Sequence, residues 1–484
     1  MRVRSLSSSI FALAACAAAL LAPSTATATS FNTVSVDTSG DKAVKLDATG
    51  GTGGQFTVTG TGGTYTITDA LGPLDVGTGC VATAMPNVVT CTTEGRVFSS
   101  SSASGNILID VTATDLRLSW SHTGAGPLVA RCATTVDCFV SGSTGNDTIT
   151  GSARRDTLYG NDGNDTIDAG DGDDSVDGGN GDDTLQGGGG DDWSAWGPGN
   201  DSFDGGDGFD IYYGGNALAA LTVTLDDVAN DGVAGELDNV RGSVEEVIGT
   251  MWSDVFWGND SRNVFDGQDG NDEIHGGGGP DTLYGGAGDD QLFGDAGSDR
   301  LFGHRGADLL NGGPGFDRTS YESAGQMMMF ADSRGAKLSL PESHNPNTTR
   351  GVVVSLDGKA NDGIPGEHDN VQVEGVTGTE FDDLLIGSDS DNDLDGLGGD
   401  DRIFGKGGDD LLLGGDDDDR LVGGRGTDEM RGEAGNDTIA ARDRQLDIVN
   451  CGIGRDTTYV DRTGDRVWGT CESVKRTGAK RRHR

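Results

Sequence analysis

The chain has 484 residues, of which 84 are glycine, 79 are aspartate or glutamate and only 34 are lysine or arginine, so its formal net charge is −45 and its pI is near 4.1. Such acidity repels phosphate backbones and anionic lipid headgroups, which argues against nucleic-acid binding and electrostatic membrane docking. So much glycine and charge also lies near the limit for forming a hydrophobic core. Either much of the chain is disordered, or a cation neutralises the charge and permits folding.

The first residues have the order of a secretory signal peptide. Arg2 and Arg4 precede an apolar stretch over residues 10–22, and small residues follow up to Ala28. We therefore expect residues 1–28 to be removed on export. A lipoprotein box over residues 13–16 is an alternative, but it would leave only a short apolar stretch. No later stretch approaches the roughly 20 apolar residues that span a bilayer, so we expect no transmembrane segment and a secreted, extracellular product, free or associated with the cell surface.

Residues 29–141 are rich in threonine and glycine and contain alternating polar and apolar segments, such as residues 55–59 and 64–68. This alternation predicts strands separated by glycine turns, and hence an N-terminal β-rich domain.

Six cysteines follow the predicted signal peptide, and an even number in an oxidising compartment favours disulfides. Their clustering in the sequence suggests the pairs Cys80–Cys91, Cys132–Cys138 and Cys451–Cys471. A metal site is the alternative interpretation, but no histidine lies near any of them and their spacings match no zinc pattern.

A nine-residue repeat organises the chain from residue 142 to residue 440. Each unit has glycine at its first positions, aspartate at the sixth and an apolar residue at the eighth, as residues 178–186 illustrate. The repeats form three blocks, over residues 142–213, 249–320 and 378–440, with 23 units in all. The sixth residue is aspartate in 21 units and asparagine in two, Asn263 and Asn392. A random glycine-rich linker would not keep this register.

The pattern resembles the nonapeptide of haemolysin-type calcium-binding (RTX) repeat proteins of the secreted bacterial type. The resemblance implies an all-β fold, a parallel β-roll or β-helix solenoid in three calcium-binding blocks, with the N-terminal β-rich domain and a disulfide-stapled C-terminal cap. In such a roll each unit is a turn of six residues and a strand of three, so two units form an 18-residue coil. The eighth residues would point inward, with Ile167 and Val176 on opposite sides of the core.

The sixth-position aspartates are the candidate metal ligands. Units two apart lie on the same edge of the roll, so Asp147 and Asp165 would flank one ion, with glycine carbonyls completing an all-oxygen shell. Calcium accepts six to eight oxygens in flexible geometry, whereas magnesium demands a tight octahedron. We therefore expect multiple Ca²⁺ ions, at most about 17 by this stacking argument. The predicted metal ligands are Asp147, Asp156, Asp165, Asp174, Asp183, Asp192, Asp201, Asp210, Asp272, Asp281, Asp290, Asp299, Asp308, Asp401, Asp410, Asp419 and Asp428.

Two similar linkers, residues 214–248 and 321–377, separate the blocks. The segments 223–240 and 354–371 within them match at 12 of 18 positions, which indicates a duplicated module. The acidic residues between Asp226 and Asp238 loosely resemble a calcium loop but lack the helix-loop-helix spacing. They are interpreted either as an ion-binding loop or as strand-and-turn connectors.

The chain ends in two short segments. Residues 441–474 resemble the closing stretch that follows calcium repeats in secreted bacterial proteins, and we expect them to cap the last roll. Residues 475–484 hold six lysines or arginines. This tail is interpreted as solvated, with a contact to an anionic wall polymer or to the acidic body of the chain as the alternative.

No catalytic motif accompanies the repeats: neither a zinc-protease H-E-x-x-H nor a hydrolase G-x-S-x-G occurs. Trp193, Trp196, Trp252 and Trp257 could form a sugar-binding strip, although in a β-roll they would more often shield one face. We therefore expect a non-enzymatic calcium-binding protein that folds and stiffens in extracellular calcium and has a structural or adhesive role, with a cell-wall polymer or extracellular polysaccharide as partner. The alternative is a calcium-stabilised secreted hydrolase or carbohydrate-binding protein with its site in the N-terminal β domain.

Overall fold

A computed structural model of the chain describes residues 127–132, 137–321, 351–462, 464–469 and 471–476 in full. For residues 32–122 and 329–339 it describes the strands by their bounds and pairing only. The predicted signal peptide and most of the basic tail lie outside the described residues.

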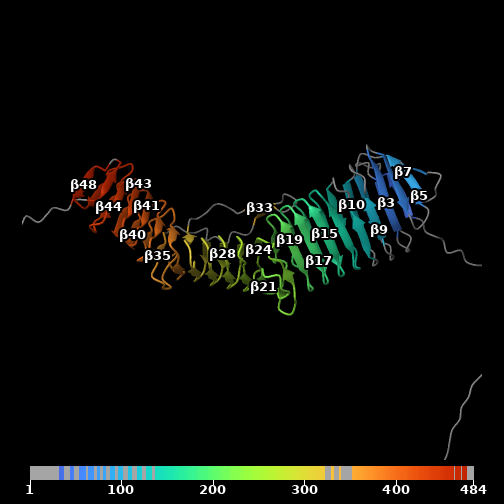
Figure 1. Cartoon of the computed structure of the whole chain (residues 1–484), viewed down its shortest axis with the longest axis horizontal. Helices are drawn as coiled ribbons and strands as arrows, with labels where there is room; N and C mark the ends of the chain where they lie inside the picture. The colour runs from blue at the N-terminus through green and yellow to red at the C-terminus, as the bar shows by residue number, and fades with distance from the viewer. Residues whose placement is uncertain are drawn as a thin grey trace, which may run out of the picture.

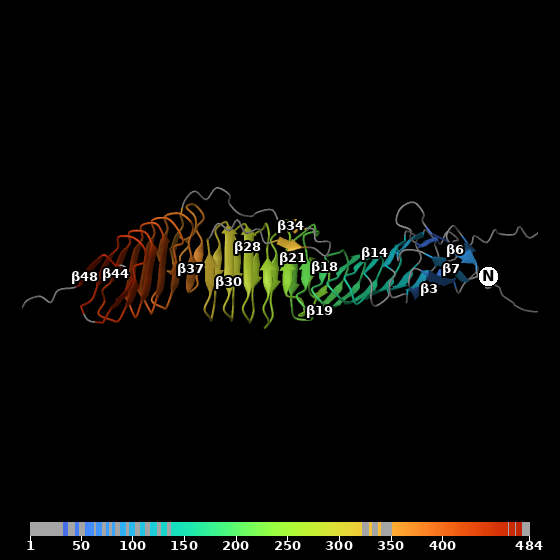
Figure 2. The same ribbon diagram turned by 90° about the horizontal axis from the view of Figure 1, so that it is seen from above.

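The strands stack into an elongated solenoid (Figure 1), and no helix is present among the described residues. One sheet of 21 strands runs along the whole length, and three successive sheets of 11, seven and seven strands form the opposite side. Figure 2 shows the same stack from above, with the chain progressing from one end to the other. The predicted all-β parallel solenoid is confirmed.

The long sheet draws strands from every part of the chain. Its members are β1 Asn32–Val36, β2 Val44–Asp47, β5 Leu74–Val76, β8 Arg96–Ser101, β10 Arg117–His122, β12 Cys138–Ser141, β14 Thr157–Asp162, β16 Ser175–Asn180, β18 Trp193–Ala195, β20 Ile211–Tyr213, β24 Glu246–Ile248, β26 Val264–Asp266, β28 Thr282–Ala287, β30 Arg300–Arg305, β32 Arg318–Ser320, β37 Gly375–Thr377, β39 Asp393–Asp395, β41 Leu411–Asp416, β43 Glu429–Ala434, β45 Ile448–Asn450 and β47 Arg466–Trp468.

The opposite side is divided into three sheets. The first holds β3 Gly54–Thr61, β4 Thr64–Asp69, β6 Cys80–Ala82, β7 Val88–Thr92, β9 Ile107–Val111, β11 Leu128–Arg131, β13 Thr148–Ser152, β15 Thr166–Asp171, β17 Thr184–Gly189, β19 Ser202–Asp207 and β23 Asn239–Val240. The second holds β21 Leu221–Thr224, β22 Gly232–Val233, β25 Val255–Trp257, β27 Glu273–His275, β29 Gln291–Phe293, β31 Leu309–Asn311 and β36 Asn370–Gln372. The third holds β35 Val353–Ser355, β38 Leu384–Ile386, β40 Arg402–Gly407, β42 Arg420–Arg425, β44 Thr438–Ala441, β46 Thr457–Val460 and β48 Ser473–Arg476, and a separate hairpin pairs β33 Met329–Ala331 with β34 Lys337–Ser339.

Residues 18 apart pair in register, as the repeat predicts. Ile149 pairs with Ile167 and Ile167 with Leu185 on one side of the solenoid, and Leu158 pairs with Val176 on the other. Each coil therefore gives one strand to the long sheet and one to the opposite sheet. Several strands are six residues long rather than the predicted three, because the glycines that open the next turn stay paired, as Gly170 does with Gly188.

The core is a double row of the eighth-position side chains, one row from each side. These side chains are almost fully buried, from Ile149 at 0% exposure to Met430 and Ile439, also at 0%. Ser194 and Thr319 occupy the same place in their units and are buried as well. A core this thin cannot stabilise a single coil, so each coil depends on its neighbours.

Where the structure describes the segments between the blocks in full, they contribute strands to the solenoid. In the first linker, Asn239 of β23 pairs with Ser202, and Val247 of β24 pairs with Tyr212. Strands β36 and β37 continue the second block in the same way. The long sheet thus continues through β24 and β37 of the two linkers, whereas the opposite side starts a new sheet near each of them.

Two of the three predicted disulfides are present, Cys132–Cys138 and Cys451–Cys471. The side chains of the predicted Cys80–Cys91 pair lie outside the described residues, although the backbone register places the two residues opposite each other. Within the described ranges, no helix is long and apolar enough to cross a membrane.

The thin core makes a matched pair of substitutions informative. Leu185→Ala removes a side chain that is 3% exposed, whereas Gln186→Ala alters the exposed neighbour in β17. We expect the first change to cost about 2–5 kcal/mol and the second less than about 0.5 kcal/mol. Hydrogen exchange of β15, β17 and β19 in saturating calcium measures both effects, and equal protection in the two variants would contradict the core assignment.

Candidate metal centres

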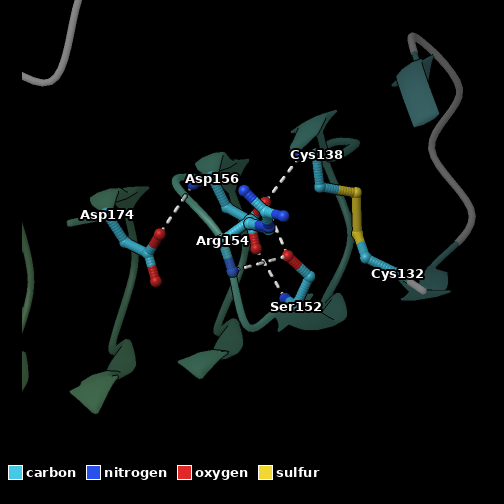
Figure 3. Close-up of a disulfide and its surroundings, with 6 residues drawn as sticks. All are labelled: Cys132, Cys138, Ser152, Arg154, Asp156 and Asp174. Carbon is cyan, nitrogen blue, oxygen red and sulfur yellow. Dashed lines mark hydrogen bonds between the residues drawn. A yellow bond between two sulfur atoms is a disulfide. The ribbon is translucent and has the colours of Figure 1, made fainter. Parts of the chain in front are cut away.

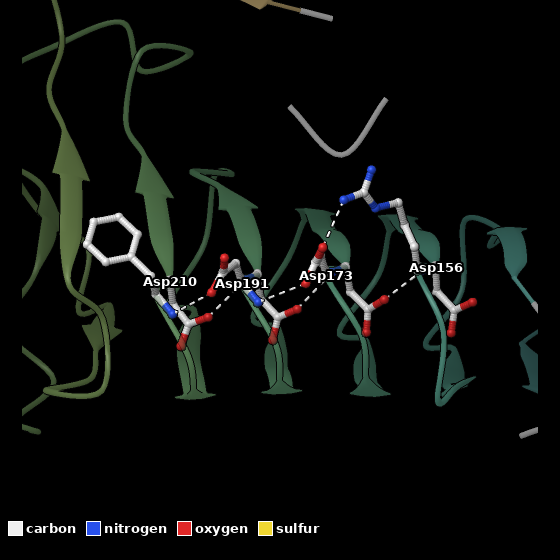
Figure 4. A network of polar contacts seen from close by, with 8 residues as sticks. Asp156, Asp173, Asp191 and Asp210 are labelled. Atoms are coloured by element: carbon white, nitrogen blue, oxygen red, sulfur yellow. Dashed lines mark hydrogen bonds and ion pairs between the residues drawn. The ribbon is translucent and has the colours of Figure 1, made fainter. Parts of the chain in front are cut away.

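The sixth-position carboxylates form hydrogen-bonded columns along the solenoid. The Oδ1 atom of Asp165 accepts the backbone N–H of Asp147 at 2.7 Å, and Oδ1 of Asp183 accepts that of Asp165 at 2.7 Å. The column on the other edge runs from Asp156 to Asp210, and Figure 4 shows it from the side. The predicted stacking of units two apart is therefore present, and one oxygen of each stacked carboxylate is held in place.

The second oxygen of most of these carboxylates has no hydrogen-bond partner. It is buried, and an isolated buried carboxylate oxygen is strongly unfavourable without a compensating positive charge or proton. The aspartates whose Oδ2 is buried and unpartnered in this way are Asp165, Asp174, Asp183, Asp192, Asp210, Asp238, Asp272, Asp281, Asp290, Asp299, Asp308, Asp317, Asp401, Asp410, Asp419, Asp428, Asp437, Asp447 and Asp456.

Glycine at the first position of most units leaves space beside these oxygens, and Ala169 and Trp196 are the exceptions. A Cβ on Gly160 would collide with Oδ2 of Asp165 and with the carbonyl oxygen of Gly178, which is the first residue of the unit one coil further on. The same two kinds of oxygen converge at Gly267 and at Gly405. A carboxylate oxygen and a backbone carbonyl oxygen of the next coil thus face the same space, which no side chain fills. We call this space beside the first-position glycine the glycine cradle.

The donor set of these cradles fits calcium. All the converging groups are carboxylate or carbonyl oxygens, which Ca²⁺ prefers in flexible geometry. Among the described residues, no three or more histidine, cysteine or acidic side chains gather into a metal-binding group. Backbone carbonyls would therefore have to supply most ligands, as the glycine-rich turns permit.

Burial raises the pKa of the stacked carboxyls far above the usual value of 3.8. The backbone hydrogen bond to each carboxylate lowers the pKa, and the negative charges of neighbouring aspartates raise it further. The pKa rises to about 7 for Asp165 and Asp183, to about 8 for Asp192 and to about 9 for Asp272. Without a cation, these groups would therefore hold protons near neutral pH.

In the first unit of each block, protein hydrogen-bond donors rather than a cation occupy both carboxylate oxygens of the sixth-position aspartate. At the start of block one, Asp147 accepts the N–H of Ser143 through one oxygen and the Ser143 hydroxyl through the other. Thr250 and Asp254, like Thr379 and Asp383, repeat the arrangement in the other blocks. The unit that follows has Ser152 bonded to both oxygens of Asp156 in block one and a neutral Asn263 or Asn392 in the other blocks.

The predicted ligands therefore divide into two groups. Fourteen of the 17 have the buried, unpartnered oxygen. Both oxygens of Asp147 and of Asp156 already accept protein donors. Asp201 is only half-buried, and its unit opens with Trp196 in place of glycine. Trp196 instead donates its indole N–H to Glu236.

Five aspartates outside the predicted set share the unpartnered oxygen, and both side-chain oxygens of Glu246 are buried without a partner as well. Asp317 and Asp437 are the last sixth-position residues of their blocks, and Asp238, Asp447 and Asp456 lie outside the blocks. They extend the columns, because Asp201 donates its N–H to Asp238 and Asp428 donates to Asp447. The nine-residue period misses these three because the intervening turns differ in length. The Asp-x-Val sequence at Asp238 and Asp447 is the signal that remains.

Glutamates close several columns. Glu245 accepts the N–H of Asp210, Glu374 accepts that of Asp317 and Glu472 accepts that of Asp456. In the first linker, both oxygens of Asp231 accept backbone N–H groups, of Thr224 and Val240. Asp231 is thus a hydrogen-bond acceptor within the solenoid, whereas Asp238 and Glu246 of the same linker have buried side-chain oxygens without a partner.

An outer column at the fifth position was not apparent from the repeat. The N–H of Asp191 bonds to Oδ1 of Asp173 at 3.3 Å, and the N–H of Phe209 bonds to Oδ1 of Asp191 at 3.0 Å. Figure 4 shows this exposed column beside the buried one. The frequent asparagine and aspartate side chains at position five therefore connect successive turns through hydrogen bonds.

The four tryptophans do not form one strip. Trp193 lies on the long sheet and stacks with Tyr213, whereas Trp257 lies on the opposite side and stacks on His275 with ring centroids 3.7 Å apart. His275 in turn stacks on Phe293. Trp193 and Trp257 therefore lie on different sheets, and each stacks on a neighbouring ring, although Trp257 remains 44% exposed.

The raised pKa values predict how the cation-free chain responds to pH. A carboxyl whose pKa is higher in the folded state favours folding at low pH, and this contribution is lost as pH rises from about 4 through the folded value near 7 or 8. In excess chelator we expect β structure at pH 5 and its loss by pH 8. Circular dichroism during a pH titration measures this, with millimolar calcium as the control in which the signal persists. A chelator-treated chain with the same β signal at both pH values would contradict the expectation.

Comparison with known families agrees with this geometry. Six segments, residues 141–176, 168–193, 253–283, 284–318, 377–412 and 413–442, match the model of the RTX calcium-binding nonapeptide repeat. The matches cover most of the second and third blocks, whereas in the first block they end at residue 193, before the last two units. A search of curated proteins finds no match to the chain.

Proposed function

We propose that this chain, with its RTX calcium-binding nonapeptide repeats, is a secreted β-roll protein that folds and stiffens when it binds extracellular calcium. The observation that supports the proposal is the column of buried carboxylates with one oxygen hydrogen-bonded and the other unpartnered beside a glycine cradle. Asp272 is typical, with 1% exposure and an unpartnered Oδ2.

Calcium would act on the fold through charge. The chain carries a formal net charge of −45, and the columns place many carboxylates one coil apart. A cation that binds only the folded state stabilises that state, and the stabilisation grows with the logarithm of the cation concentration above the dissociation constant. The chain would remain unfolded where calcium is scarce and form a rod where calcium is plentiful. Export through a signal peptide, supported by residues 1–28, would deliver the chain to such a medium.

The proposed role of the folded rod is structural or adhesive rather than catalytic. A groove beside the first block is lined by Trp196, Asn161, Asn180 and Asp177 and by the exposed Leu218. An aromatic ring beside amide and carboxylate groups is suited to a polysaccharide, which supports an extracellular polymer as the partner.

Calcium-dependent folding is tested on the purified chain at pH 7.5. We expect weak β signal and an expanded chain in excess chelator, and strong β signal with a rod-shaped scattering profile in millimolar calcium. Magnesium at the same concentration serves as the ionic-strength control and should not restore the rod, because it keeps its octahedral waters. Circular dichroism and small-angle scattering that do not change between chelator and calcium would sink the proposal.

Two adjacent residues separate ligand charge from general acidity. Asp183 is buried with an unpartnered oxygen, whereas Asp182 is exposed and its carboxylate accepts from Asn200. We expect Asp183→Asn to lower the number of bound calcium ions by about one and Asp182→Asn to leave it unchanged. Titration calorimetry gives both numbers, and an equal loss in the two variants would show that bulk charge alone attracts the ions.

A further inference from the structure

The last complete cradle of the third block lies at the end of a column that leaves the repeats. Asp419 donates its N–H to Asp437, Asp437 donates to Asp456 at 2.9 Å, and Asp456 donates to Glu472 at 2.7 Å. Asp437 is 1% exposed, and its Oδ2 is buried without a partner. It therefore has the same arrangement as the aspartates inside the block.

The carbonyl oxygen that faces Asp437 comes from a cysteine. At Gly405 and at Gly414 the converging carbonyl belongs to the glycine that opens the unit one coil further on, Gly423 and Gly432. At Gly432 a Cβ would instead meet Oδ2 of Asp437 and the carbonyl oxygen of Cys451. Cys451 lies beyond the last segment that matches the repeat family, residues 413–442. The repeats thus do not supply all of their own last cradle.

A disulfide holds this carbonyl in place. Cys451 is fully buried and bonded to Cys471, the residue immediately before Glu472. The bond therefore ties the turn that presents the Cys451 carbonyl to the turn that closes the Asp437 column. Among the described strands, β48 pairs with β46 alone. A terminal strand with one neighbour frays readily, so the covalent link adds a restraint at this end that the strand pairing alone does not supply.

We propose that Asp437 and the carbonyl of Cys451 form a terminal calcium site whose affinity depends on the Cys451–Cys471 disulfide. The proposal rests on the calcium-binding function proposed above. Groups that orient a metal ligand without touching the metal typically change affinity by about 10- to 100-fold when removed. The disulfide acts in this way on a backbone ligand.

The second disulfide, Cys132–Cys138, lies just before the first block and offers a matched control. Cys138 donates its N–H to Oδ1 of Asp156, and the other oxygen of Asp156 accepts the N–H of Ser152 (Figure 3). Cys132–Cys138 therefore borders a carboxylate with no unpartnered buried oxygen. Its loss should leave calcium binding unchanged.

The test counts calcium ions on the full chain by native mass spectrometry at graded free calcium. In the Cys451→Ser, Cys471→Ser double variant we expect one ion to be lost, or its affinity to fall by about tenfold or more. Asp437→Asn, which keeps the disulfide, should remove the same ion. Adding the cysteine changes to Asp437→Asn should then cause no further loss. The Cys132→Ser, Cys138→Ser variant should match the unmodified chain.

The outcomes separate the two proposals. An unmodified chain that binds no calcium contradicts the proposed function itself. Calcium binding that is intact in the Cys451→Ser, Cys471→Ser variant overturns the terminal site while the proposed function stands. Further loss when the cysteine changes are added to Asp437→Asn shows that the disulfide acts elsewhere in the solenoid, and this also overturns the proposal.

Discussion

The structure depends on the sixth-position carboxylates, in most of which one oxygen is hydrogen-bonded and the other is buried without a partner. One oxygen accepts the backbone N–H of the preceding coil on the same edge, as Asp165 does from Asp147. This bond turns the other oxygen inward, where it is buried beside a glycine and faces no donor. A buried charge of this kind needs a cation or a proton. Each such turn is therefore stable only when a cation or a proton neutralises its buried carboxylate.

That requirement accounts for the distribution of residue types. The core is a double row of single side chains, too thin to offset the repulsion between columns of carboxylates. Glycine at the first position keeps the space beside Asp Oδ2 open, and Trp196 is the position where a large side chain replaces it. Serine or threonine at the second position closes the first unit of each block, as Thr379 does for Asp383. Coils that need a cation thus stack on coils that do not.

The repeat unit could be predicted from the sequence because it keeps a strict nine-residue period. The 18-residue coil, the inward eighth residues and the stacking of aspartates two units apart all follow from that period. The hydrogen bonds to both oxygens of Asp147 could not be predicted, because they come from the N–H and hydroxyl of Ser143 within the same turn. The extension of the columns to Asp238 and Asp447 was missed since longer turns break the period there. The continuity of the linkers with the blocks was missed for the same reason.

The most direct measurement is a crystal structure of the calcium-loaded chain with anomalous difference maps recorded at a long wavelength. Calcium binding by the buried columns predicts peaks beside the unpartnered Oδ2 atoms of Asp165, Asp272 and Asp410, each within calcium-ligand distance of a glycine carbonyl of the next coil. It also predicts no peaks beside Asp147, Asp254 and Asp383, whose oxygens are already bonded. Peaks distributed over the exposed fifth-position carboxylates, with none at the buried columns, would contradict the account.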